Sequence, residues 1–137
     1  MKDSYKIDEI TPGMSASLTH IVTDEDVRKF ADVSGDHNPV HLDEDYAKQS
    51  RFGRRIAHGL FGASFFSSLF GTRLPGRGCV YAGQNLKFRR PVHIGDTVIA
   101  TVTVLSVDAV KKRVLFSTVC TVEGKDVITG DAEIFIP

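Results

Sequence analysis

The sequence predicts an α+β domain in which a curved antiparallel sheet wraps around one long buried helix. Residues 56–70 carry no charged side chain and are apolar or small on every helical face, as in a helix buried all round. Residues 79–136 then change to a period of two and are rich in Val, Ile, Thr and Phe, which favour strands. At 137 residues the chain is long enough for one hydrophobic core, so residues 1–137 are expected to form a single domain.

The N-terminal part predicts a strand followed by a helix. Residues 14–22 alternate as a first strand, and Thr23 then begins a helix whose first turn resembles an acidic capping box. Ser34 and Gly35 end this helix. Helical spacing places on its inward face Val27, Phe30, Ala31 and Val33.

The middle of the chain predicts a turn, a short helix, a loop and the buried helix. Asp43 is a candidate cap for a short helical turn, and residues 49–55 are polar and basic, as in a loop. The buried helix follows over residues 56–70, and Gly71 and the Leu-Pro-Gly segment at 74–76 stop it. Because both sides of this helix must be covered, a second subunit is expected to cover what the sheet does not.

The C-terminal part predicts strands joined by turn signals. A loop is expected at residues 91–96 and a hairpin turn at residues 123–126. The expected strands are residues 79–81, 84–88, 97–107, 113–122 and 131–136.

Composition gives no support to several classes of function. Seventeen basic residues balance seventeen acidic ones, so no global field favours nucleic acid or an anionic membrane. The apolar segment 56–70 is too short to span a bilayer, and residues 1–10 lack a signal-peptide core, so a cytoplasmic protein is expected. Cys79 and Cys120 are expected to be reduced, and the histidine spacing favours no metal site.

The most informative segment is the run Asp-His-Asn-Pro-Val-His at residues 36–41. Fully extended, five residues would separate Asp36 from His41 by roughly 16 Å. The Asn-Pro pair favours a turn, however, which folds the chain back and brings the carboxylate and the imidazole onto one water molecule. Such an acid/base pair is the minimum equipment for hydration, dehydration or hydrolysis.

These elements and motifs resemble the MaoC-like branch of the hotdog fold. The resemblance covers nearly the whole chain and is carried by residues 36–41, Ile-Ala-His-Gly at 56–59, Leu-Pro-Gly at 74–76 and Phe-Arg-Arg-Pro-Val at 88–92. The single-domain length is most similar to bacterial (R)-specific enoyl-CoA hydratases that supply polyhydroxyalkanoate synthesis. The resemblance implies syn addition of water to a trans-2-enoyl thioester, an acyl-CoA substrate, a homodimer and no cofactor.

The resemblance also implies roles for individual residues. Asp36 and His41 match the catalytic pair, and the sequence leaves open which of them is the base. Gly59, at the start of the buried helix, matches the residue whose backbone N–H binds the thioester oxygen, a role that a helix N-terminus suits. Asn38 matches the turn residue that holds the loop, and it is expected to be mainly structural.

Two further residues are expected to support the site. Ser67 lies eight residues after Gly59 on the same helical face, where it either touches the acyl chain or serves only packing. His58 either orients the site or has a cap or core role. Phe65, Phe66 and Phe70 either limit the depth of the acyl pocket or belong to the core.

Basic residues form two short runs that are candidates for binding the phosphates of the carrier. Arginine suits phosphate geometry, although such runs are usually solvated faces, and an acidic acyl carrier protein would fit the same patch. The alternative functions are therefore a 3-hydroxyacyl-carrier-protein dehydratase and a non-catalytic acyl-thioester-binding partner. The candidate arginines are Arg54, Arg55, Arg89 and Arg90.

Overall fold

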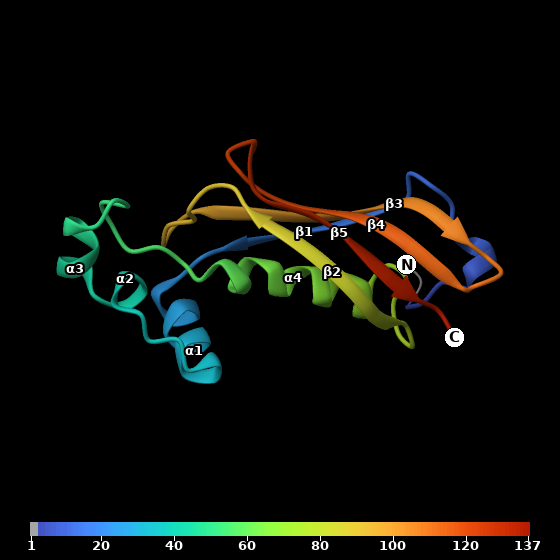
Figure 1. Ribbon diagram of the computed structural model, residues 1–137, viewed down its shortest axis with the longest axis horizontal. Coiled ribbons are helices and arrows are strands. Elements are labelled where there is room, and N and C mark those ends of the chain that lie inside the picture. Colours follow the sequence, from blue (N-terminus) through green and yellow to red (C-terminus); the bar gives the residue numbers. More distant parts are fainter. Residues whose placement is uncertain (1–2) are drawn as a thin grey trace.

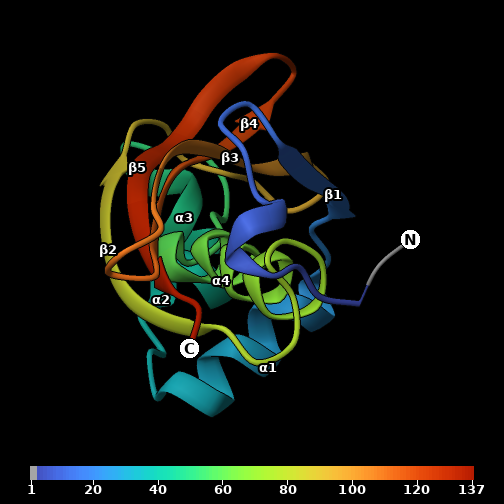
Figure 2. The same cartoon turned by 90° about the vertical axis from the view of Figure 1, so that its right-hand side faces the viewer.

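The computed structural model describes residues 3–137 as a five-stranded antiparallel sheet curled around helix α4 (Figures 1 and 2). Residues 1 and 2, part of the segment in which no signal peptide is expected, lie outside the described residues. The strands follow the order β1-β3-β4-β5-β2. Their bounds are β1 Ser15–Ile21, β2 Val80–Phe88, β3 Thr97–Asp108, β4 Arg113–Val122 and β5 Lys125–Phe135.

Helix α1, Asp24–Ser34, follows β1 and begins with the expected capping box. The Thr23 hydroxyl accepts the N–H of Asp26 at 3.1 Å, and the Asp26 carboxylate accepts the N–H of Thr23 at 3.0 Å. Gly35 ends the helix in the left-handed region with φ 80°. The prediction that Val33 faces inward is wrong, because its side chain is 88% exposed.

Two short helices, α2 Pro39–Leu42 and α3 Glu44–Gln49, connect α1 to the loop before α4. Each is capped by the side chain before it: Asn38 accepts the N–H of Val40, and Asp43 accepts the N–H of Tyr46. In Figure 1 helices α1, α2 and α3 gather at one end of the molecule, beside the start of α4. This end contains the turn at residues 36–41.

Helix α4, Gly59–Thr72, begins three residues later and ends two residues later than the predicted segment. Phe66, Leu69 and Phe70 are buried and pack against the sheet. The expected burial on every face is not achieved within one chain, because the opposite face is exposed. This open face comprises Leu60, Ser64, Ser67, Ser68 and Gly71.

The strands form longer and more continuous elements than the sequence predicts. The segments expected at 79–81 and 84–88 are one strand, β2, with an irregularity between Tyr81 and Gly83. The turn before β5 consists of Glu123 and Gly124, with φ 51° and 76°, so β5 begins at Lys125. Alternate residues of β3 and β4 face α4 and complete the core, among them Val98, Ala100, Val102, Val114, Phe116 and Cys120.

The two remaining expectations concern the cysteines and the membrane. Cys79 and Cys120 are both free, as predicted. Among residues 3–137, no helix combines the length and the apolar character that crossing a bilayer requires.

Candidate active site

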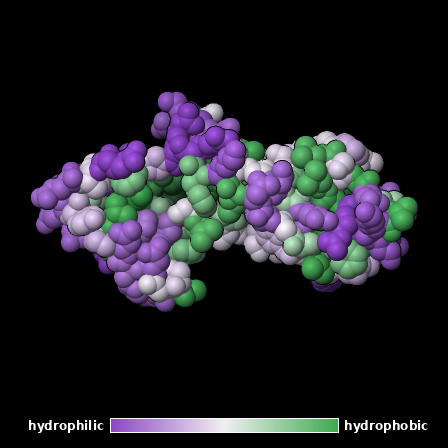
Figure 3. All heavy atoms as spheres, in the orientation of Figure 1, coloured by the Kyte–Doolittle hydropathy of each residue, from purple (hydrophilic) through white to green (hydrophobic). Residues whose placement is uncertain are grey.

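A cavity of about 720 Å³ opens where the start of α4 meets α1, α2, the loop after α3 and the ends of β2 and β5. The volume lies within the range of small-molecule sites. Figure 3 shows apolar surface in the middle of the molecule and in its right half, whereas the left end is mainly hydrophilic. The polar residues in the wall of the cavity are Ser34, Asp36, His41, Arg51, His58, Arg89 and Arg90.

The turn at residues 36–41 brings Asp36 and His41 to the cavity wall, as the sequence predicts. The Asp36 carboxylate oxygen Oδ1 accepts the N–H of Asn38 at 3.1 Å, and Asn38 Oδ1 accepts the N–H of Val40 at 3.3 Å. These successive side-chain-to-backbone bonds reverse the chain and start α2. Asn38 itself does not line the cavity, so its contacts fit the structural role expected of it.

His41 is held in one tautomer. Its side chain is buried at 7% exposure, and Nδ1 lies 2.7 Å from the carbonyl oxygen of Ile56. Because a carbonyl only accepts, Nδ1 donates, and the lone pair of the neutral ring is on Nε2. Burial, opposed by the Ile56 hydrogen bond, lowers the pKa of His41 below 6.5, and His58 adds to the lowering while Asp36 opposes it.

His58 is packed between the ring of His41 and that of Phe30. Its ring stacks on His41 with centroids 3.8 Å apart, and the Phe30 ring lies 4.8 Å away on centroids. Nε2 donates to the backbone oxygen of Asp36 at 2.9 Å, while Nδ1 is buried without a hydrogen-bond partner among the described residues. His58 therefore connects the start of α4 to both members of the predicted pair.

Donor atoms of Asp36, His41 and His58 lie within 4.8 Å of one another, a spacing that also fits a metal ion. The two imidazole rings, however, are stacked with an interplanar angle of only 26°. Nearly parallel rings direct their in-plane lone pairs side by side rather than toward one point. The cluster is better arranged to hydrogen-bond a water molecule than to chelate an ion, and the absence of a metal remains a prediction.

Gly59 is the first residue of α4 and lines the cavity. Its backbone N–H belongs to the first turn, where α-helical geometry provides no acceptor, and the helix dipole favours negative charge there. A Cβ at this position would lie 2.7 Å from two carbons of the Phe88 ring. The packing of the Phe88 side chain therefore favours glycine here, in addition to any approach of a ligand.

Ser67 is placed differently from the expectation. It is exposed on the open face of α4 and does not line the cavity of this chain. Its supporting role remains a prediction, without a contact inside one chain that favours it.

Arg54 and Arg55 do not line the cavity. Arg55 Nε donates to the backbone oxygen of His41 at 2.7 Å, and its guanidinium pairs with Asp24 at 2.7 Å. The hydrogen bond from Arg55 also contributes most to lowering the pKa of Asp24. With only 11% of its side chain exposed, Arg55 joins α1 to the turn at residues 36–41, and the structure argues against a phosphate-binding role for it.

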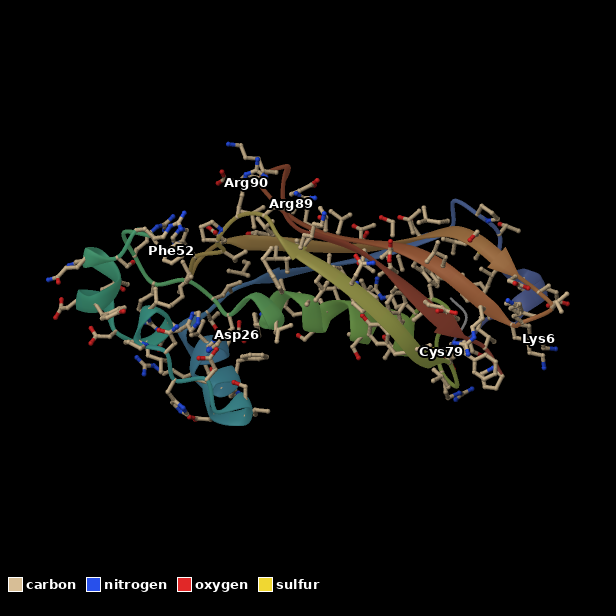
Figure 4. The ribbon with its side chains drawn as sticks, in the orientation of Figure 1. Lys6, Asp26, Phe52, Cys79, Arg89 and Arg90 are labelled. Atoms are coloured by element: carbon tan, nitrogen blue, oxygen red, sulfur yellow. The ribbon has the colours of Figure 1, made fainter. Side chains whose placement is uncertain are left out.

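Arg89 and Arg90 lie at the end of β2, beside the turn between β4 and β5 (Figure 4), and both line the cavity. Arg89 donates to the Thr129 hydroxyl at 3.1 Å, and Arg90 donates to the backbone oxygen of Asp126 at 2.6 Å. Arg51 also lines the cavity, from the loop after α3. It belongs to the basic loop at residues 49–55. The sequence did not indicate which of the arginines in this loop would line the cavity.

Comparison with known proteins identifies the family. The MaoC-like domain model matches residues 9–128. The (R)-specific enoyl-CoA hydratase of Rhodospirillum rubrum is 51% identical over 133 residues, covering 97% of this chain and 92% of that protein. The (R)-hydratase from Aeromonas caviae involved in PHA biosynthesis superposes with TM-score 0.91 at 38% identity, covering 93% of this chain and 98% of that one. The unliganded R-hydratase PhaJ1 from Pseudomonas aeruginosa gives TM-score 0.90 at 42% identity, covering 96% and 84%. The chain therefore belongs to the MaoC-like family and has the hotdog fold of its (R)-hydratases.

Proposed function

We propose that this protein is an (R)-specific enoyl-CoA hydratase, which reversibly adds water to a trans-2-enoyl-CoA to give an (R)-3-hydroxyacyl-CoA. The observation that carries the proposal is the meeting of Asp36, His41 and the first residue of α4, Gly59, at one cavity. The (R) configuration is inferred from the named relatives, since the geometry of the free site does not specify a face of the double bond.

The reaction needs charge stabilisation at the thioester oxygen. When water attacks C3 of an enoyl thioester, the electron pair of the double bond moves toward the carbonyl, and an enolate oxygen develops. The Gly59 N–H, at the positive end of α4, is placed to donate to that oxygen. One preorganised donor of this type contributes roughly 3 kcal/mol to the transition state.

The second need is a base for the water. His41 Nε2 carries the lone pair, because Nδ1 is committed to Ile56, so His41 is the base in this proposal. Nε2 takes one proton as the water oxygen bonds to C3, and the resulting imidazolium returns a proton to C2 on the same face. The Asp36 carboxylate accepts a hydrogen bond from the other O–H of the water, which stays intact, and so holds the water in place. The net change is H at C2 and OH at C3, without oxidation or reduction.

The carrier is proposed to be coenzyme A, with its phosphates near Arg51, Arg89 and Arg90 at the cavity. Three guanidinium groups on two separate loops suit a ligand with several phosphate groups. The same patch also fits an acidic acyl carrier protein, so a 3-hydroxyacyl-carrier-protein dehydratase is the alternative. A non-catalytic thioester-binding partner is the second alternative.

Loss of the conjugated enoyl absorbance on crotonyl-CoA tests the function. Asp36→Asn and His41→Ala are each expected to lower kcat by roughly 10²–10⁴-fold with an unchanged fold by circular dichroism. His37→Ala is the matched control, because His37 lies in the same turn but is exposed and outside the cavity wall. Normal turnover in both site variants would overturn the mechanism, and turnover only on carrier-protein substrates would favour the alternative. Thioester binding without turnover by the unmodified protein would identify a non-catalytic partner.

The proposal extends to the assembly and setting of the protein. Residues 1–137 form one MaoC-like domain, and two copies form a homodimer through the open face of α4, which a single chain leaves uncovered. The named role of the Aeromonas caviae (R)-hydratase supports a place in fatty acid metabolism that supplies polyhydroxyalkanoate synthesis, in the cytoplasm.

A further inference from the structure

The segment that precedes α4 holds His41 through both its backbone and its ring. The Arg55 side chain donates from Nε to the backbone oxygen of His41 at 2.7 Å. The backbone oxygen of the next residue, Ile56, accepts the hydrogen bond from Nδ1 of the His41 ring at 2.7 Å. The Ile56 N–H also donates to the backbone oxygen of Val40 at 3.3 Å. Two consecutive residues therefore fix the backbone around His41 and the orientation of its imidazole.

The other side of the same segment is fixed by the loop between β2 and β3. His93 Nδ1 lies 3.1 Å from the backbone oxygen of Arg55, and because a carbonyl only accepts, Nδ1 donates. Ile56 and His93 also form an antiparallel bridge. The Ala57 N–H donates to the backbone oxygen of Val92 at 2.7 Å. In a trans peptide the C=O and the N–H point in opposite directions, so the Ile56 oxygen points away from Val92.

We propose that Arg55 and His93 are positioning residues for the proposed base, His41. They hold the backbone oxygen of Ile56 in the direction that selects the Nδ1–H tautomer and leaves the lone pair on Nε2. The inference rests on the proposed hydratase function, in which Nε2 takes the proton from the water. Neither Arg55 nor His93 lines the cavity, so their effect on the reaction passes through the His41 ring.

The tautomer needs this support because a neutral imidazole can carry its proton on either nitrogen. If the Ile56 oxygen turns away, Nδ1 of His41 loses its acceptor, and the tautomer with the proton on Nε2 becomes populated. That tautomer presents a donor to the water and cannot act as the base. A displacement of a reacting group by about 1 Å can also cost roughly 100-fold in rate.

The first test replaces Arg55 by Met, which keeps a long side chain but donates no hydrogen bond. Asp24, the ionic partner of Arg55, is half exposed and stays hydrated, so the variant is expected to fold. We expect kcat on crotonyl-CoA to fall roughly 10- to 100-fold with little change in KM. Arg73→Met is the matched control, because Arg73 also donates to a backbone oxygen, that of Ser17, but lies outside the cavity wall. It is expected to leave kcat unchanged.

The second test separates the hydrogen bond of His93 from its packing. His93→Leu fills similar space without a donor, so kcat is expected to fall as in Arg55→Met. His93→Asn places an amide NH2 near the position of Nδ1 and is expected to restore most of the loss. Urea denaturation measures the stability of both variants. A similar loss of stability in both, with kcat unchanged, would overturn the positioning role.

The third measurement needs no substrate. The chemical shifts of the two ring nitrogens of His41, measured by NMR at a pH where the ring is neutral, show which nitrogen carries the proton. The unmodified protein is expected to show one tautomer, protonated on Nδ1, whereas Arg55→Met and His93→Leu are expected to show a mixture of both.

The tautomer and the turnover distinguish the two levels of the argument. Unchanged nitrogen shifts of His41 in both variants would overturn the positioning role and leave the hydratase function intact. No hydration of any enoyl thioester by the unmodified protein, with the tautomer changed in the variants, would instead overturn the function and support the hold of Arg55 and His93 on the ring.

Discussion

At the residue scale, one hydrogen bond decides which nitrogen of His41 acts as the base in the proposed mechanism. The Ile56 oxygen accepts from Nδ1, so Nε2 is the basic atom and no rearrangement of the ring is needed before proton transfer. Burial keeps the ring neutral, because the charged form loses its hydration. The site thereby holds a base that is unprotonated near neutral pH.

The acid limb of kcat/KM is therefore expected to have an apparent pKa below 6.5, the usual value for histidine. The unfolded chain binds a proton at 6.5 and the folded chain only at lower pH, so the contribution of His41 to stability is complete above 6.5. It falls as the pH drops through the folded pKa. Asp36→Asn should lower the pKa of His41 further, since the Asp36 charge raises it. NMR titration of the His41 ring measures this shift, and an increase would contradict the proximity of the two groups.

His58 is a positioning residue in this geometry, and His58→Phe tests it. The ring stack with Phe30 and His41 is retained, but the donor to the Asp36 oxygen is lost, which costs about 1 kcal/mol. We expect kcat to fall about 10-fold with little change in KM, and the free energy of unfolding to fall by no more than about 1 kcal/mol. His58→Gln, which keeps an amide donor, should recover part of the loss. An equal fall in stability for both variants, without a change in kcat, would indicate a purely structural role.

The residue-level predictions succeeded where the information was local. Asp36 and His41 lie five residues apart around an Asn-Pro turn, so their meeting follows from turn chemistry. The bond from His58 to the Asp36 oxygen joins residues 22 apart and depends on how α4 docks. For Arg55 the sequence was misleading. It predicted a phosphate-binding residue from a run of basic residues, but the guanidinium is paired with Asp24, a contact that the run does not reveal.

At the scale of elements, the start of α4 is fixed by its contact with the end of β2. The Phe88 ring packs where Gly59 has no side chain, so strand and helix approach closely at the proposed oxyanion donor. The caps of α1 and α3 were predicted from the sequence, because caps depend on neighbouring residues alone, whereas residues 39–42 were predicted as part of a turn and form helix α2. Val33 was misplaced because it follows Val27 by six residues, roughly 240° around a helix of 3.6 residues per turn, so its side chain lies off the buried face of Val27 and Ala31.

Gly59→Ala is expected to lower the free energy of unfolding by about 1–3 kcal/mol, because its Cβ would overlap the Phe88 ring. Phe88 is half exposed, so the ring has room to move, and the lower end of this range is expected. Urea denaturation of Gly59→Ala, Phe88→Ala and the double variant measures the coupling. Additive losses would show that the two positions do not compete for the same space.

At the scale of the whole molecule, the cavity is assembled from segments that are far apart in the sequence. Its walls come from the loop after α3, the start of α4, and strands β2, β3, β4 and β5. The sequence predicted the sheet and the helix but not which strand residues face the cavity, since that depends on the order β1-β3-β4-β5-β2 and its register. Phe88 and Cys120 were missed for this reason.

The open face of α4 is the predicted dimer interface. Ser68→Glu places a charge on this face outside the cavity wall and is expected to convert a dimer into monomers, because an unpaired charge is costly to bury. Light scattering coupled to size-exclusion chromatography measures the mass. Ser106→Glu, an equally exposed serine on β3, serves as the control. A monomeric wild-type protein, or a Ser68→Glu protein that remains dimeric, would contradict an interface on α4.

Arg55 extends the influence of the site beyond the cavity. A single guanidinium contacts both the first turn of α1, through Asp24, and the backbone of His41. A substitution that removes the Asp24 carboxylate would therefore free the Arg55 guanidinium, which also holds the backbone of His41. Substitution of Asp24, an exposed residue outside the cavity wall, is therefore expected to disturb the position of His41.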